Sequence, residues 1–216
     1  EEKQLAFLQT LLSDAEKVGK PAELLKVNLL AYMGRLHRML GHSQEAKTCF
    51  EKALAGADFS KSPTLPGAAV TMGAALMEKG DMKNAARLLR DGVNRLGESP
   101  GDAAFLASGL RDLARIEMEI GSVDSALALL YRAEGAAMGR IADSSSYWLC
   151  LYDQRGWVNF AAGSHQLAMA DFDKALARKD VAEALRAQPL EGAGRCCIAL
   201  GDMGKAVSYL QQSLSL

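Results

Sequence analysis

The sequence contains the residue types used in metal and thiol sites, but not in the spacing that such sites need. None of the four cysteines, at positions 49, 150, 196 and 197, belongs to a CxxC pair. Adjacent cysteines such as Cys196 and Cys197 rarely form a disulfide, so we expect reduced thiols in a reducing compartment such as the cytoplasm. The three histidines (His37, His42 and His165) share no metal-ligand spacing with one another or with the cysteines. We therefore expect no metal site.

No stretch of the sequence resembles a catalytic constellation. The segment "GAGRCC" at 192–197 has closely spaced glycines, as phosphate-binding loops do, but no strand precedes it. We find neither a Ser–His–Asp arrangement nor a pair of carboxylates in contrasting environments. The sequence therefore predicts a protein that is not an enzyme and that needs no cofactor.

The composition is typical of a folded protein without a strong charge bias. Of the 216 residues, 49% are hydrophobic and 24% are charged, and the net charge is −1. This balance argues against nucleic acid or an anionic membrane surface as a partner, and no apolar run is long enough to span a membrane. The chain begins at Glu1 without a methionine and ends inside a helical pattern. We therefore expect it to be part of a larger protein.

A pattern of small and large residues returns five times along the chain. Glycines lie at 41, 80, 121, 163 and 201, at spacings of 39, 41, 42 and 38. The residue seven before each is small, the residue five after is alanine, the residue nine after is bulky and apolar, and the residue twelve after is small. A period of this size is typical of stacked supersecondary units.

Each position in this repeat has a physical reason. The glycine follows a helical run and can adopt the left-handed conformation that ends a helix. Asp81 and Asp202, or Ser122 and Ser164, follow the glycine and can cap the next helix. We expect the preceding small residue to face the later alanine across a tight helical hairpin. The bulky residue is then expected to pack against the next hairpin, because stacked repeats stabilise one another.

The sequence therefore predicts an all-α solenoid of stacked antiparallel helix pairs over residues 1–216. Residues 1–20 would form half a repeat, followed by repeats near 22–58, 66–98, 103–139, 145–179 and 181–216. The first helices of the pairs are expected near 22–40, 67–79, 103–120, 145–162 and 181–200. The second helices are expected near 43–55, 82–96, 122–138, 164–178 and 203–215. Pro63, Pro66 and Pro100 are expected in linkers. The first helix of the fifth pair should begin near Pro189, after a short helical turn.

This pattern resembles tetratricopeptide repeats over nearly the entire chain. The usual tetratricopeptide repeat has about 34 residues, whereas the repeats here have about 40. In this respect the chain is similar to the long-period variants in MalT-like bacterial regulators, Rap-type peptide receptors and LGN-like adaptors. The resemblance implies a right-handed superhelix whose first helices line a concave face, where a partner peptide would bind.

The resemblance also selects candidate partner-binding residues on the first helices. They are mostly charged or amide side chains, with one aromatic ring: Asn28, Arg35, Arg38, Arg111, Arg115, Asp153, Gln154, Trp157, Glu191 and Arg195. Arginine offers a fixed fork of donors that suits carboxylates, so a partner with acidic side chains or a C-terminal carboxylate is one hypothesis. The alternative is that each arginine only solvates its helix and pairs with Asp112, Glu119 or Glu191.

Two functions fit these expectations. The first is a protein-interaction scaffold that binds a peptide or partner segment in a concave groove. The second is the ligand- or peptide-sensing arm of a multidomain regulator. An enzyme is a third class, and the absence of a catalytic constellation argues against it.

Overall fold

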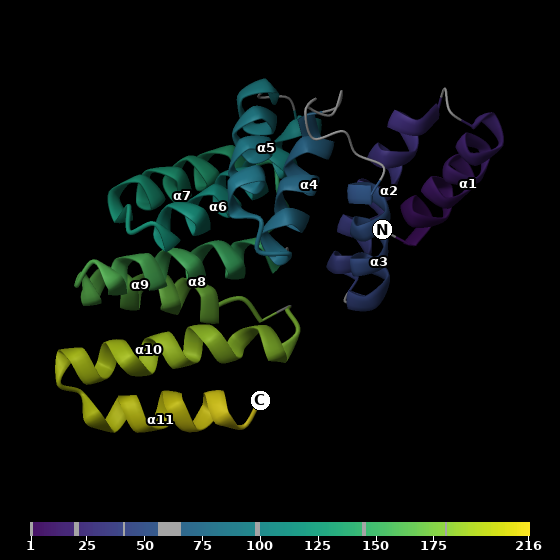
Figure 1. Ribbon diagram of the computed structural model, residues 1–216. Helices are drawn as coiled ribbons and strands as arrows, with labels where there is room; N and C mark the ends of the chain where they lie inside the picture. The colour runs from purple at the N-terminus through teal and green to yellow at the C-terminus, as the bar shows by residue number, and fades with distance from the viewer. Residues whose placement is uncertain are drawn as a thin grey trace. The chain divides into compact units, whose positions relative to one another are not determined.

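The computed structural model describes residues 2–19, 22–40, 42–55, 66–97, 100–143, 146–179 and 181–216 (Figure 1). These residues contain no strand, so the predicted all-α class is confirmed. The helices are α1 (Glu2–Val18), α2 (Glu23–Met39), α3 (Ser43–Ala55), α4 (Pro66–Glu78), α5 (Met82–Arg95), α6 (Pro100–Glu119), α7 (Val123–Ala137), α8 (Ser146–Ala161), α9 (His165–Leu176), the short 3₁₀ helix η2 (Glu183–Arg186), α10 (Ala187–Leu200) and α11 (Met203–Leu214).

The helices form two compact units, which we describe separately. Unit 1 comprises Glu1–Asp112 and unit 2 comprises Leu113–Leu216, with the boundary inside α6. In unit 1, α2 pairs with α3 and α4 pairs with α5, while α1 packs on α2. In unit 2, α8 pairs with α9, α10 pairs with α11, and α10 also contacts α8 and α9. Four of the five predicted helix pairs are observed in this way, whereas the pair of α6 with α7 and a single solenoid over 1–216 stay predictions.

Left-handed glycines end the first helices of four pairs, as predicted. Gly80, Gly121, Gly163 and Gly201 have φ angles of 80°, 81°, 74° and 84°. A side chain would strain the backbone in this conformation, which explains why glycine recurs here. Gly41, the equivalent residue of the first pair, lies outside the described residues.

The residue after the glycine caps the second helix only where it is aspartate. Asp81 accepts a hydrogen bond from the Asn84 backbone N–H at 3.2 Å, and Asp202 accepts one from the Lys205 backbone N–H at 3.1 Å. Ser122 occupies the same position at the start of α7, but its side chain makes no capping hydrogen bond. Ser164 likewise makes none at the start of α9. The expectation that the serines cap these helices is therefore wrong.

The close approach inside each hairpin differs in one detail from the prediction. The small residue before the repeat glycine faces the bulky residue of its own second helix, and in two of the pairs it also faces the alanine as predicted. The observed pairs are Gly34 with Phe50, Gly73 with Leu89, Gly156 with Phe172 and Gly194 with Leu210. Glycine leaves room for the long side chain. A Cβ added at Gly73 would also lie 3.2 Å from the carbonyl oxygen of Ala85, and one added at Gly194 would lie 3.5 Å from that of Ala206. The alanines are nevertheless buried, and Ala168 is 0% exposed.

Phe172 in unit 2 shows how one hairpin packs against the next. A Cβ added at Gly156 would lie 2.6 Å from Cε1 of Phe172, so the ring rests directly on α8. Gly192 of α10 meets the same ring from the following hairpin. The predicted packing of the bulky residue against the next hairpin is therefore confirmed at this position.

Pro66 and Pro100, which we expected in linkers, lie in the first turns of helices, and Pro189 lies near the start of a helix as predicted. Pro66 and Pro100 are the first residues of α4 and α6, and Pro189 is the third residue of α10. The first turn of a helix has backbone N–H groups without helical partners, so proline is tolerated there. As a result α6 begins at Pro100, earlier than predicted, and α10 begins at Ala187 after the helical turn η2. Pro63 lies outside the described residues.

Candidate functional site

Most of the predicted site residues occupy two repeating positions on the first helices. The positions ten and six residues before the repeat glycine are four residues apart, so both lie on the same face of the helix. The position ten before holds Arg111, Asp153 and Glu191, and the position six before holds Arg35, Arg115, Trp157 and Arg195. The remaining candidates, Asn28, Arg38 and Gln154, lie at other positions of the same helices.

In unit 2 the structure brings together candidates from α8 and α10. The guanidinium carbon of Arg195 lies 5.5 Å from the centroid of the Trp157 ring, within the range of a cation–π contact. Arg195 also donates a hydrogen bond to Glu191, with 2.5 Å between Nη2 and Oε1. Trp157 packs edge-on against Phe172, with ring centroids 5.4 Å apart, which fixes the indole on α8. These contacts define an aromatic and charged patch, which we call the Trp157 patch, made of Asp153, Trp157, Glu191 and Arg195.

Asp153 is the most unusual residue of the Trp157 patch. It is 9% exposed, and its buried Oδ1 atom has no hydrogen-bond partner among the described residues. Burial raises the pKa of Asp153 to about 7, although hydrogen bonding with the Trp157 side chain opposes this rise. An acceptor that is buried without a partner costs free energy, so this carboxyl group is a candidate for a ligand contact.

The other candidates of unit 2 lie apart from these contacts. Gln154 of α8 is half-buried, and Arg115 of α6 is exposed to solvent. Neither residue contributes to the contacts that define the Trp157 patch.

In unit 1 the candidate arginines contact their own protein. Arg35 donates a hydrogen bond to the carbonyl oxygen of Ala104 at 3.3 Å, and its guanidinium carbon lies 4.2 Å from the centroid of the Phe105 ring. Arg111 lies 3.8 Å from Asp112. The alternative that arginines pair with neighbouring acids is therefore observed for Arg111, as it is for Arg195 with Glu191 in unit 2.

The two remaining candidates of unit 1 lie on α2. Asn28 is buried, and its Oδ1 atom has no hydrogen-bond partner in the part of the chain that the structure describes. The Arg38 side chain lies outside the described part of the structure, although its backbone belongs to α2.

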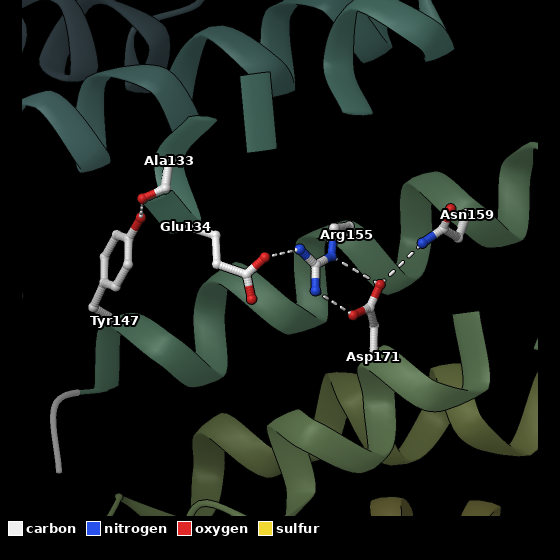
Figure 2. A network of polar contacts seen from close by, with 6 residues as sticks. All are labelled: Ala133, Glu134, Tyr147, Arg155, Asn159 and Asp171. Carbon is white, nitrogen blue, oxygen red and sulfur yellow. Dashed lines mark hydrogen bonds and ion pairs between the residues drawn. The ribbon is translucent and has the colours of Figure 1, made fainter. Parts of the chain in front are cut away.

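A buried polar network in unit 2 was not predicted from the sequence (Figure 2). Arg155 is 2% exposed and binds both oxygens of Asp171, at 2.7 and 3.0 Å. Its third hydrogen bond goes to Glu134 at 2.5 Å, and Asn159 donates a further bond to Asp171 at 2.9 Å. The network thus connects α7, α8 and α9 through a single guanidinium group.

The network stabilises the charged form of the Arg155 guanidinium group. Burial favours its neutral form, but hydrogen bonds and charge interactions with Asp171 and Glu134 outweigh it and raise the pKa of Arg155 above its usual value.

The sequence does contain a signal for this network. The position of Arg155 is methionine, leucine or alanine in the other four repeats, and the position of Asp171 is cysteine, leucine or tyrosine. Charged residues at two apolar repeat positions are best explained by an internal pair.

The described residues contain no group of three or more side chains that could hold a metal ion. Among the same residues, no helix has the length and apolar character needed to cross a bilayer.

Cys196 and Cys197 are free and buried, and burial raises the pKa of Cys196 to about 11. A thiol with such a pKa carries little thiolate near neutral pH, and Cys196 is 0% exposed, so we interpret Cys196 as a packing residue.

Solved structures similar to the chain include two that are named as tetratricopeptide-repeat proteins. BtubC (BKLC) from P. vanneervenii superposes with a TM-score of 0.70 at 18% identity, covering 99% of this chain and 89% of BtubC. TTC0263, a thermophilic tetratricopeptide-repeat protein of Thermus thermophilus, has a TM-score of 0.56 at 22% identity, covering 86% and 89%. YrrB, a tetratricopeptide-repeat protein with an unusual peptide-binding site, has a TM-score of 0.53 at 15% identity, covering 94% and 91%.

The sequence comparisons are more limited. No curated protein matches the chain in sequence. Residues 187–216, which form α10 and α11, match the family model of the tetratricopeptide repeat. The predicted resemblance to this family is confirmed, while the finer likeness to its long-period members stays a prediction. The chain therefore has the fold of tetratricopeptide-repeat proteins, and its last helix pair carries a tetratricopeptide repeat.

Proposed function

We propose that the chain is a protein-interaction scaffold and that a peptide or partner segment binds across the first helices of its pairs. In unit 2 these helices are α8 and α10, and the Trp157 patch would form the contact surface. In the longer-range arrangement that the resemblance implies, the first helices would line a concave groove.

The observation that carries this proposal is the exposure of the Trp157 patch. The neighbouring helix positions are buried, because Gly156 and Gly194 pack against the second helices of their pairs. In contrast, Trp157 and Glu191 are only half-buried and Arg195 is exposed. A tryptophan and an arginine that are ordered by each other but still accessible are typical of binding surfaces.

The tetratricopeptide-repeat fold agrees with this role. Repeat proteins present extended surfaces that suit peptide segments, and the similar protein YrrB has a peptide-binding site. We further propose that part of the partner is acidic or ends in a carboxylate, because the exposed Arg115 offers a guanidinium fork on the first helix α6.

A pull-down from the native lysate tests the proposal. The bait is the chain itself, compared with a folded variant that carries Arg111→Glu and Arg115→Glu. A matched control carries glutamate at arginines of second helices, Arg87 and Arg132. We expect the parent and the control to retain a partner that the first variant loses.

Retention of the partner by the first variant would contradict binding across the first helices and would favour another face. If none of the baits retains a partner, the scaffold proposal fails and the sensing arm of a multidomain regulator becomes the better hypothesis.

A further inference from the structure

The buried carboxyl group of Asp153 identifies a more specific feature of the partner. Asp153 lies on α8 one helical turn before Trp157, and none of the described residues donates a hydrogen bond to its buried Oδ1 atom. A buried oxygen of this kind normally accepts a hydrogen bond from the protein, from ordered water or from a ligand.

The nearby arginine of α8 does not supply that donor. Arg155 lies only two residues after Asp153, but residues two apart on a helix point to different sides. Its hydrogen bonds go to Asp171 and Glu134 instead. Arg155 is therefore paired with other acidic residues and does not bind Asp153.

The other nearby cation, Arg195, contacts the Trp157 patch but is held only lightly. It lies over the Trp157 ring and pairs with Glu191, yet its side chain is 53% exposed. Exposed ion pairs of this kind contribute little free energy, so another cation can replace the guanidinium at low cost. The ring face of Trp157 and the Glu191 carboxylate would then be open to another cation, and the Asp153 carboxyl group adjoins this ring through its hydrogen bond with the Trp157 side chain.

We propose that Asp153 receives a lysine or arginine side chain of the partner segment, which displaces Arg195 from the Trp157 ring. This inference rests on the proposed function, because it assigns partner chemistry to the Trp157 patch. An incoming cation gains a cation–π contact with Trp157 and a charge-assisted hydrogen bond with Asp153. The partner would thus place a basic residue on unit 2 in addition to any acidic group.

The titration of Asp153 agrees with this assignment. Its pKa is raised to about 7 by burial, so the free protein holds this carboxyl partly neutral near pH 7. A cation placed next to it favours the charged form, which offsets the cost of burying the carboxylate.

Selection from a random dodecapeptide display library tests the inference. The full chain, the isosteric variant Asp153→Asn and the control Asp124→Asn, an exposed aspartate of α7, are used as targets. We expect peptides selected on the full chain to share a lysine or arginine. One such peptide should bind Asp124→Asn as it binds the full chain, and Asp153→Asn at least about 10-fold more weakly.

Two further measurements separate a direct contact from a structural effect. Replacing the shared basic residue by norleucine should weaken binding to the full chain by more than this factor, and to Asp153→Asn only by the smaller loss of the contact with the Trp157 ring. The variant Arg195→Gln, which removes the resident cation, should bind the basic peptide several-fold more tightly. Weaker binding to Arg195→Gln would overturn the displacement of Arg195.

The outcomes also distinguish this inference from the proposed function. If the selected peptides share no basic residue, or if Asp153→Asn binds them as well as the full chain does, the role of Asp153 is overturned while peptide binding stands. If no peptide is enriched on the full chain, both proposals fail.

Discussion

Asp153 and Asp171 lie in the same unit and are buried to a similar extent, with 9% and 5% of their surfaces exposed. Asp171 accepts two hydrogen bonds from Arg155 and one from Asn159. Asp153 has an oxygen that accepts none from the described residues, and burial raises its pKa to about 7. The two carboxyl groups therefore share their burial but not their partners.

The difference separates a structural role from a candidate binding role. A buried ion pair is retained when its hydrogen bonds are complete, and breaking it leaves an uncompensated charge. Asp171 meets this condition and joins α9 to α8. Asp153 does not meet it, and its position beside Trp157 provides a place where a ligand could complete it. The roles of Asp153 and Asp171 can thus be distinguished by their hydrogen-bond partners but not by their burial.

The largest expected effect comes from removing the cation of the complete network. The variant Arg155→Met leaves Glu134 and Asp171 without their shared partner, so we expect it to lower the free energy of unfolding by about 3–5 kcal/mol. Both tryptophans, Trp148 and Trp157, belong to unit 2, so urea unfolding followed by tryptophan fluorescence reports on this unit.

The matched control for this change is Arg195→Met, which removes an exposed arginine of the same unit. Its effect on unfolding should stay within about 1 kcal/mol, because the pair with Glu191 is exposed. Equal losses in the two variants would show that the network of Arg155 does not stabilise unit 2 more than a surface pair does.

The second effect concerns pH and the incomplete carboxyl group. The pKa of Asp153 rises from 3.8 to about 7 on folding, so the folded chain binds this proton more tightly than the unfolded chain. The resulting stability is fully present below pH 3.8 and is lost as the pH rises through about 7. A rise of about three pKa units corresponds to a loss on the order of 4 kcal/mol at complete ionisation.

The variant Asp153→Asn should lack this loss. We therefore expect the stability of Asp153→Asn relative to the parent chain to increase between about pH 5 and pH 8, measured by urea unfolding at each pH. A difference that stays constant over this range would mean that Asp153 has a partner in the folded chain and that its contrast with Asp171 is wrong.

The smallest expected effect comes from a change in the close helix packing beside the network of Arg155 and Asp171. Ala168 of α9 is 0% exposed and lies three residues before Asp171. The variant Ala168→Leu should overpack the hairpin of α8 and α9 and lower the free energy of unfolding by about 1–3 kcal/mol. The exposed Ala199→Leu is the control. Neutral melting of Ala168→Leu would contradict the packing assigned to this alanine.

The helix pairs could be predicted because their requirements are local. A glycine that ends a helix needs a left-handed backbone, and a tight hairpin needs small residues at a fixed distance from it. Both requirements appear in the sequence at regular spacing, and Gly80, Gly121 and Gly163 are among the residues that meet the first of them. The caps were less predictable, since Ser122 and Asp81 occupy equivalent positions but only Asp81 accepts the capping bond.

The network and the candidate site depended on contacts between distant residues. Arg155 binds Asp171 and Glu134, which lie 16 and 21 residues away, so its role became clear only when three helices were placed together. For the Trp157 patch, the sequence indicated the helix face but not the contact between Arg195 and Trp157. Nor could it indicate the incomplete hydrogen bonding of the Asp153 carboxyl group, because that depends on every neighbouring side chain.

The position of Phe172 between two glycines has a consequence for how unit 2 unfolds. The ring rests on Gly156 of its own hairpin and on Gly192 of the next one. In a linear array of repeats, stability is approximately the sum of the terms of single repeats and of the interfaces between neighbours. Phe172 contributes to both kinds of term at once. Separation of the α10–α11 hairpin would therefore expose a side chain that the hairpin of α8 and α9 also needs, which couples the unfolding of the two hairpins.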